Sequence, residues 1–139
     1  MFCENRRASS GRSAPSVSRP IVSGLHVNYQ QKDPAMNIMS LDAAPQVPVP
    51  FDARVMHSDG PVEVIHILLQ PGEGVPPHDN PFDVLFYVLE GCGELTIEDQ
   101  VRSVAADNLI AIPTGTQRGW KNTGSDPVRL LVIKLLGAN

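Results

Sequence analysis

The apolar and polar positions of the chain fall into short runs, each about as long as a β-strand and each followed by turn-forming residues. The run VLFYVL at 84–89 is continuously apolar, whereas the stretch that follows alternates Leu95 and Ile97 with polar neighbours. Runs at intervals of roughly 8–12 residues are typical of an all-β sandwich or barrel. We therefore predict about eight strands, at Asp52–His57, Val62–Leu69, Asp83–Leu89, Glu94–Glu98, Val101–Val104, Asn108–Ile112, Arg118–Asn122 and Val128–Leu136.

Glycine and proline separate these runs, with 11 glycines and 13 prolines in 139 residues. We expect Gly91, Gly93 and Gly115 to occupy turns that need a positive φ angle. The segment Leu41–Pro50, LDAAPQVPVP, contains too many prolines for a helix and is interpreted as an irregular lead-in to the strands.

Residues 1–35 differ in composition from the rest of the chain. They carry five basic and two acidic residues, a formal +3, whereas the remaining 104 residues carry six basic and thirteen acidic residues, a formal −7. The first stretch is rich in serine and arginine and shows no apolar periodicity, so we interpret it as a disordered tail. A start codon placed too early, upstream of Met36 or Met39, is the alternative. Residues 36–139 are predicted to form a single domain.

Composition narrows the classes of function. A hydrophobic content of 42% is enough for a globular core, and a net charge of −4 gives little support for nucleic-acid binding. No apolar run approaches the roughly 18 residues of a membrane span, so we predict no membrane partner. The two cysteines, Cys3 and Cys92, form no CxxC motif or disulfide framework. We expect both thiols to be reduced, in a cytoplasmic protein.

Two stretches carry the most specific pattern in the chain. Residues 74–91 read GVPPHDNPFDVLFYVLEG, and residues 107–122 read DNLIAIPTGTQRGWKN. Together they resemble the two signatures of the cupins, G-x5-H-x-H-x3,4-E-x6-G and G-x5-P-x-G-x2-H-x3-N. In the second stretch Pro113, Gly115 and Asn122 match, and Asp107 stands where the family has its first glycine. The resemblance covers about residues 50–137 and implies a double-stranded β-helix, a jelly-roll barrel of the small single-domain cupin type.

The resemblance also implies a metal held by two histidines and a carboxylate of the first signature and a histidine of the second. The matching residues here are His78, Asn80, Val84 and Arg118, so the metal-binding motifs are degenerate. An amide is a poor ligand for transition metals, valine has no donor atom, and arginine does not lose its proton. A guanidinium about 4 Å from a cation would cost about 4 kcal/mol per unit of cation charge at an effective dielectric constant near 20. We therefore predict no conventional metal cofactor.

Two further residues leave a non-standard divalent metal site open as an alternative. Asp83 lies one residue before the carboxylate position, and strand alternation would point it away from the barrel axis unless a bulge turned it inward. His66 lies in the middle of the run VEVIHILL, and strand parity could place it at the barrel mouth near His78. If a metal is bound, His78, Asp83 and His66 are its candidate ligands.

The residues at the metal-ligand positions of the two signatures, together with their aromatic neighbours, predict an anion-binding pocket. Arg118 offers a planar set of donors suited to a carboxylate or a phosphate. His78 and Asn80 would add hydrogen-bonding groups, while Trp120 and Phe86 would supply apolar or stacking walls. The alternative is that Arg118 forms an internal ion pair with Asp83 or Asp79.

The sequence thus supports a binding module for a small anionic metabolite, held without a conventional metal. The alternative is a cupin enzyme, either oxygenase-like with a metal or isomerase-like without one, that uses His78 with Asp83 or His66. Whether the chain is an enzyme stays open at this stage. The resemblance further implies a homodimer, because dimers are common in the family.

Overall fold

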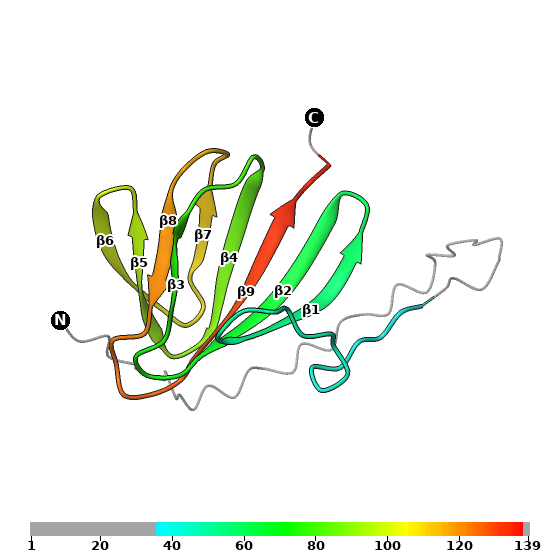
Figure 1. The fold of residues 1–139 in the computed structure, drawn as a ribbon, viewed down its shortest axis with the longest axis horizontal. Coiled ribbons are helices and arrows are strands. Elements are labelled where there is room, and N and C mark those ends of the chain that lie inside the picture. The colour runs from blue at the N-terminus through cyan, green and yellow to red at the C-terminus, as the bar shows by residue number, and fades with distance from the viewer. Residues whose placement is uncertain (1–35, 138–139) are drawn as a thin grey trace, which may run out of the picture. The chain divides into compact units, whose positions relative to one another are not determined.

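The computed structural model describes residues 36–137, and residues 39–137 belong to one folded unit that contains every strand. The fold within these residues is all-β, as predicted, with two antiparallel sheets and no helix. One sheet has the strand order β1-β2-β9-β4-β7, and the other has the order β3-β8-β5-β6 (Figure 1). The strands are β1 Asp52–Asp59, β2 Val62–Leu69, β3 Gly74–His78, β4 Asp83–Glu90, β5 Cys92–Ile97, β6 Gln100–Ala105, β7 Leu109–Ile112, β8 Arg118–Lys121 and β9 Val128–Leu135.

The two sheets pack face to face around one hydrophobic core. On β4, Val84, Phe86 and Val88 are buried, while the residues between them lie toward the outside, as strand alternation requires. Val128, Leu130 and Val132 on β9 show the same period, and the core also takes Leu95 and Trp120 from the four-stranded sheet. The predicted orientation of β4 is therefore confirmed.

One strand, β3, is not predicted by the sequence pattern. This strand contains Pro76 and Pro77, which cannot donate ladder hydrogen bonds, and the sequence therefore reads as a loop. The structure accommodates both prolines because β3 is an edge strand that pairs only with β8, and its register is irregular between Val75 and His78. The pairing matters for the site, since it places His78 directly opposite Arg118.

The proline-rich lead-in is also more ordered than the sequence suggests. The amide of Val47 donates to the carbonyl of Ala53 at 2.8 Å, and the amide of Val55 donates to the carbonyl of Pro45 at 2.8 Å. A bridge between Gln46 and Arg54 completes this short attachment along β1. The lead-in therefore runs beside the first strand and packs the side chains of Val47 and Phe51 against the core.

Two glycines show different reasons for lacking a side chain. Gly91 has φ +82°, and a Cβ there would collide with the carbonyl of Pro127, so both backbone conformation and space require glycine. Gly93 was predicted to need a positive φ, and this is wrong, since its φ is not in that region. A Cβ on Gly93 would instead lie 3.2 Å from the ring of Trp120, so this glycine makes room for the indole.

Cys92, at the start of β5, is disulfide-bonded, so the expectation of a reduced thiol there is wrong. Cys3 lies outside the described residues. Sequence separation gives no signal for such a bond, because a disulfide requires only that two Cα atoms come within about 7 Å in the folded chain.

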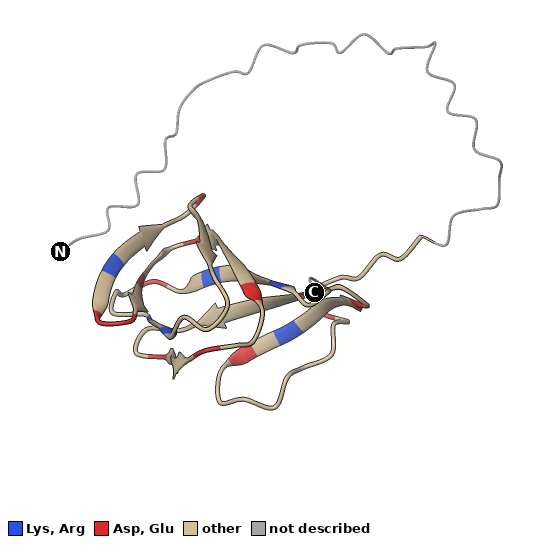
Figure 2. Cartoon of the chain, turned by 90° about the horizontal axis from the view of Figure 1, so that it is seen from above, with Lys and Arg blue, Asp and Glu red and all other residues tan. Residues whose placement is uncertain are grey.

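Charged residues are distributed along several strands and loops. Figure 2 shows basic and acidic positions as separate bands on the ribbon rather than as one continuous basic stripe. Residues 36–137 include no helix with the length and apolar character that crossing a membrane would need.

Asn122, the last residue of the second signature, fixes the turn between β8 and β9. It is fully buried, and its Nδ2 donates to the carbonyls of Leu69 at 2.9 Å and Asp126 at 2.8 Å, while its Oδ1 accepts from the amide of Gly124 at 3.0 Å. This position of the signature therefore has a structural role in the chain rather than a ligand-binding one.

We predict that Asn122→Ala lowers the free energy of unfolding by about 2–4 kcal/mol, because it leaves the carbonyls of Leu69 (buried) and Asp126 (partly buried) without their donor and the amide of Gly124 without its acceptor. Urea denaturation followed by circular dichroism measures the change. The matched control is Asn108→Ala, since the side chain of exposed Asn108 accepts one hydrogen bond, at its Oδ1 from the amide of Ala105 at 3.1 Å. That change should cost about 1 kcal/mol; equal losses for the two variants would contradict the assigned role of Asn122.

Candidate ligand-binding site

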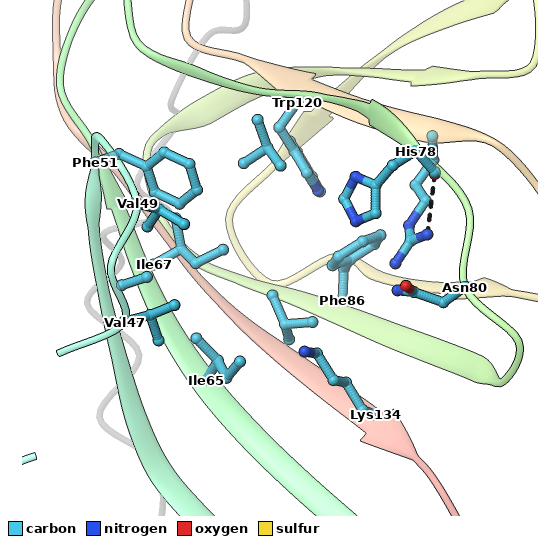
Figure 3. A pocket seen from close by; sticks show the side chains of 14 residues that line it. Val47, Val49, Phe51, Ile65, Ile67, His78, Asn80, Phe86, Trp120 and Lys134 are labelled. Carbon is cyan, nitrogen blue, oxygen red and sulfur yellow. Dashed lines mark hydrogen bonds between the residues drawn. The ribbon is translucent and has the colours of Figure 1, made fainter. Parts of the chain in front are cut away.

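A cavity of about 190 Å³ lies inside the barrel, between the two sheets and the lead-in segment (Figure 3). One part of its wall is apolar and another part is polar and basic. The apolar and aromatic residues come from the lead-in and from β1, β2, β3, β4, β8 and β9. The polar side chains come from β3, the loop after it, β8 and β9. The lining residues are Val47, Val49, Phe51, Ala53, Ile65, Ile67, Val75, His78, Asn80, Phe86, Arg118, Trp120, Val132 and Lys134.

Arg118 is the buried cation of this cavity. It begins β8, and only 3% of its surface is exposed. Its Nη1 donates to the carbonyl of His78 at 3.0 Å, and its Nη2 donates to the side-chain oxygen of Asn80 at 2.6 Å when the Asn80 amide takes the orientation that satisfies its neighbours. The Nε of Arg118 has no hydrogen-bond partner.

No described acidic residue forms an ion pair with Arg118. Asp83, one proposed partner, instead accepts hydrogen bonds from the amide and the hydroxyl of Thr114, both at 2.8 Å. Asp79 lies outside ion-pair distance and acts on Arg118 only through its longer-range field, which raises the arginine pKa. Burial acts more strongly in the other direction and lowers the pKa of Arg118. The expected alternative of an internal ion pair with Asp83 or Asp79 is therefore wrong.

An aromatic pair, Phe86 and Trp120, lies beside the guanidinium, and Phe86 makes the contact with it. The Cζ of Arg118 lies 5.8 Å from the centre of the Phe86 ring, within the range of a cation–π contact. Phe86 and Trp120 pack edge to face with their ring centres 5.3 Å apart. The indole Nε1 of Trp120 is buried and has no hydrogen-bond partner. The cavity thus has a second unused donor besides the Nε of Arg118.

His78 lies at the exposed end of β3, and its ring is directed into the cavity beside Phe86 (Figure 3). Its Nδ1 is 3.0 Å from the carbonyl oxygen of Pro76. A carbonyl oxygen only accepts hydrogen bonds, so Nδ1 carries the proton and Nε2 is the unprotonated nitrogen of the neutral ring. This tautomer leaves Nε2 free to accept a proton or a hydrogen bond.

The structure brings all five predicted ligand-binding residues, His78, Asn80, Phe86, Arg118 and Trp120, to one cavity. Lys134 and the lead-in residues also line the cavity and were not predicted from the sequence. Lys134 reads as a solvated charge near the chain end, although its period-2 spacing from Val128, Leu130 and Val132 places it on the inner face. Val47 and Phe51 carried no strand signal, because they lie among prolines.

The alternative metal ligands do not come together. Asp83 is exposed and hydrogen-bonded to Thr114, and Val84 takes the inward position beside it. His66 lies on β2 between Ile65 and Ile67, which line the cavity, so its side chain points to the opposite face of the sheet. The expectation that His66 lies near His78 at the barrel mouth is therefore wrong.

The donor set of the cavity differs from what the family's metal site requires. Within residues 36–137 no group of three or more His, Cys, Asp or Glu side chains is arranged to hold a metal ion. The buried Arg118 guanidinium stands in the position of one ligand, and Val84 in the position of another. These residues do not fit a four-ligand cation site.

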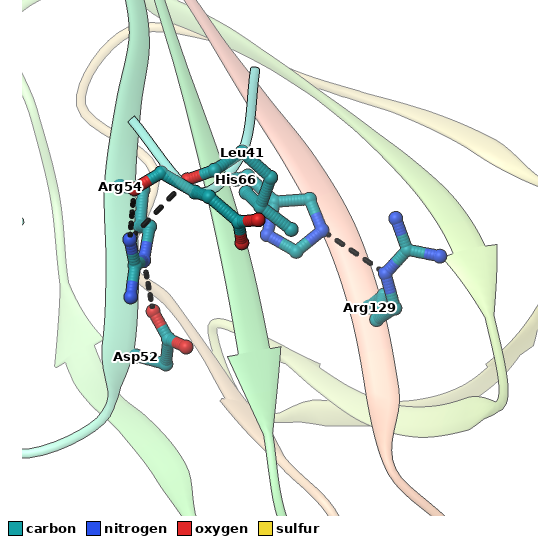
Figure 4. Close-up of polar contacts among 6 residues, drawn as sticks. Leu41, Asp52, Arg54, His66 and Arg129 are labelled. Atoms are coloured by element: carbon teal, nitrogen blue, oxygen red, sulfur yellow. Dashed lines mark hydrogen bonds and ion pairs between the residues drawn. The ribbon is translucent and has the colours of Figure 1, made fainter. Parts of the chain in front are cut away.

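His66 belongs to a separate polar cluster on the outer face of the five-stranded sheet (Figure 4). Its Nε2 accepts a hydrogen bond from the Nε of Arg129 at 3.1 Å, while its Nδ1 is buried without a partner. Arg54 lies on the neighbouring strand and donates to Asp52 at 3.1 Å and to the carbonyl of Leu41 at 3.2 Å. Burial lowers the pKa of His66, Arg129 and Arg54 lower it further, and Asp52 partly opposes them.

Comparison with known proteins agrees with this geometry. Residues 57–134 match the cupin domain family, which is more than half of the chain, and the protein belongs to that family. A 5-nitrosalicylic acid 1,2-dioxygenase from Bradyrhizobium sp is 32% identical over 66 residues, which cover 48% of this chain and 32% of the dioxygenase. The chain therefore matches about a third of that enzyme's length.

Solved structures show the same barrel. The polyketide cyclase RemF from Streptomyces resistomycificus has a TM-score of 0.65 at 21% identity, with 71% of this chain and 78% of that chain covered. A predicted oxalate decarboxylase from Thermotoga maritima has a TM-score of 0.66 at 15% identity, with 72% of this chain and 99% of that chain covered. At these identities the likeness shows the fold alone.

We predict that the lowered pKa of His66 makes stability depend on pH. Below its ordinary pKa of 6.5, the unfolded chain takes up a proton that the folded protein excludes. The contribution of His66 to the free energy of unfolding is therefore complete above pH 6.5, where the ring is neutral in both states. It is lost as pH falls from 6.5 toward the lower pKa of the folded protein. Urea denaturation between about pH 7.5 and pH 5 should show falling stability, before most carboxylates protonate near pH 4.

His66→Gln should flatten this slope, since glutamine offers an oxygen to Arg129 and does not titrate. The control is His57→Gln, on an exposed part of β1. His66→Gln should reduce the pH dependence of the free energy of unfolding by the same amount in the wild-type background and in the His57→Gln background. An identical pH slope for wild type and His66→Gln would refute the linkage.

Proposed function

We propose that this cupin barrel binds a small organic acid, with the carboxylate of the ligand against Arg118 and its apolar part against the walls of the cavity. The site would do so without a conventional metal centre. The observation that supports this most directly is the burial of Arg118, without a carboxylate partner, in a cavity whose lining is mostly apolar and includes no acidic residue.

An unpaired buried cation is costly to a folded protein. The effective penalty for burying an ion is several kcal/mol, and only close counter-charges and hydrogen bonds offset it. Arg118 uses two of its five N–H donors on His78 and Asn80. The remaining donors, which include Nε, suit the parallel hydrogen bonds that guanidinium makes to a carboxylate. A bound organic acid would therefore supply the missing charge and the missing acceptors together.

The rest of the cavity limits the size and polarity of the ligand. A volume of about 190 Å³ is smaller than sites for drug-sized ligands, which occupy about 300–1,000 Å³. The walls from Val47, Phe51, Ile67 and Phe86 favour an aromatic or branched aliphatic body. A relative named for 5-nitrosalicylic acid, an aromatic carboxylic acid, adds support for this class.

We predict that benzoate or a branched short-chain acid binds the wild-type protein and that Arg118→Met weakens binding at least about tenfold, since a charge-assisted hydrogen bond contributes about 1.5–3 kcal/mol. Isothermal titration calorimetry measures affinity, with the corresponding amides as uncharged control ligands. Arg102→Met on β6 is the control variant, because exposed Arg102 bonds to Gln100 and lies outside the cavity.

The unliganded Arg118→Met protein should change in stability by no more than about 1 kcal/mol, because the loss of two hydrogen bonds is offset by removal of a buried charge. Undiminished acid binding by Arg118→Met would contradict the proposal. Stoichiometric iron, manganese, nickel or zinc in protein purified without chelators would contradict its metal-free part.

A second candidate function is metal-independent acid–base catalysis by His78, as in an isomerase-like reaction. It is favoured by the hydrogen bond of Nδ1 to the carbonyl of Pro76, which holds the ring in the tautomer with a free Nε2 at the cavity. A neutral imidazole held in this way can take a proton from a bound acid and return it.

We predict, for this second candidate, that wild-type protein exchanges a carbon-bound proton next to the carboxylate of a bound acid with deuterium from D₂O, as seen by proton NMR. His78→Gln should abolish exchange while ligand affinity changes less than about tenfold, because acid–base catalysis and binding depend on different groups. Binding without exchange in the wild-type protein would leave the barrel as a binding module.

A further inference from the structure

Lys134 is a second cation that faces the same cavity as Arg118. It lies on β9 in register with Val84 of β4 and Glu63 of β2, with the same strand parity as the buried residues Leu130 and Val132. Figure 3 shows its side chain directed toward the cavity below Phe86, and it is among the lining residues. The cavity is therefore bordered by two full positive charges from different strands.

None of the residues that line the cavity is acidic. Arg118 has no carboxylate partner, and Lys134 has one, Glu63, with its Nζ 3.3 Å from the Glu63 Oε1. Both side chains of this pair are about one-quarter exposed, at 25% for Lys134 and 24% for Glu63, and Glu63 does not line the cavity. Partly exposed ion pairs of this kind are weak, so Lys134 can exchange Glu63 for another anion at little cost.

Valine at position 84, in place of the family's carboxylate, explains why Lys134 is available to bind an anionic group of a ligand. Val84 occupies the place that matches the family's carboxylate ligand and lies directly across from Lys134. A carboxylate at position 84 would pair with the ammonium group, whereas valine leaves Lys134 with Glu63 as its acidic partner and with the Phe82 ring, whose centre lies 6.0 Å from its Nζ. The positive charge that a divalent cation would bring to such a cavity is provided here by two side chains, Arg118 and Lys134.

We propose that the ligand carries two separate anionic groups, one bound by Arg118 inside the barrel and the other bound by Lys134 after it leaves Glu63. This inference rests on the proposed function, since it extends the anion site at Arg118. A small dicarboxylate with a compact apolar body is the simplest ligand of this class. One carboxylate completes the hydrogen bonding of Arg118, and the second distinguishes this ligand from a simple monocarboxylic acid.

The test compares acids that match in shape and differ by one charge. The probes are isophthalate with its monoamide, 3-carbamoylbenzoate, and adipate with its monoamide, each titrated calorimetrically into wild-type protein. We expect at least one diacid to bind about tenfold or more tightly than its monoamide, which corresponds to about 1.4 kcal/mol. Lys134→Met should remove this preference while the affinity for the monoamide stays within about twofold, because only the second carboxylate loses its partner.

Two further variants complete the design. Glu63→Gln should raise the affinity for the diacid and leave that for the monoamide unchanged, because it removes the anion that competes for Lys134. Lys121→Met is the matched control, since Lys121 is an exposed residue of β8 outside this cavity, and it should keep the wild-type preference. If Lys134→Met does not fold, Lys134→Gln serves for the same comparison.

The outcomes separate this inference from the proposed function. Equal binding of diacid and monoamide by wild type, or an undiminished preference in the folded Lys134 variant, overturns the two-anion proposal and leaves the Arg118 site standing. Binding of neither the diacids, their monoamides nor the monocarboxylic acids overturns the proposed function, and the two-anion proposal with it.

Discussion

The site depends on one physical constraint, a guanidinium buried inside an apolar barrel without a carboxylate to balance it. Arg118 is 3% exposed and has two hydrogen bonds to neutral oxygens, those of His78 and Asn80. Burial depresses its pKa, which means that the surroundings stabilise its charge less well than water does. The folded protein therefore carries the cost of an unbalanced buried charge. Binding of an anionic ligand would relieve part of that cost, and this adds to the binding free energy.

The sheet topology produces this constraint through a single strand pair. Edge strand β3 tolerates Pro76 and Pro77 because it needs a partner on only one side, and its pairing with β8 puts the carbonyl of His78 against Arg118. Gly93 on the neighbouring strand leaves room for the ring of Trp120, which packs on Phe86 beneath the guanidinium. Residues from β3, β4, β5 and β8 thus fix the position of the cation before any ligand binds.

Family membership accounts for the fold of the protein, whereas the chemistry of the cavity comes from the individual side chains that line it. Membership of the cupin family, and the shared barrel of distant solved structures, account for the two sheets and the internal cavity. The chemistry of the cavity follows from this chain's own side chains, because cationic Arg118 and apolar Val84 stand at positions where the family signature has metal ligands. Fold alone therefore does not transfer a metal-dependent activity to this protein. His66 and Asp83, which the sequence offered as substitute ligands, serve outer-face contacts instead.

Local patterns in the sequence were sufficient to predict the all-β class and most strands, because period-2 alternation is a property of neighbouring residues. The spacing of the two motifs was sufficient to predict five residues of the cavity. They were sufficient also to show that Arg118 cannot ligate a metal, since this follows from its side-chain chemistry. Only the tertiary structure decided that β3 is a strand, that His66 faces outward, that Arg118 lacks an acidic partner and that Lys134 shares its cavity. These features depend on which segments pack together over long sequence separations, and no local pattern encodes that pairing.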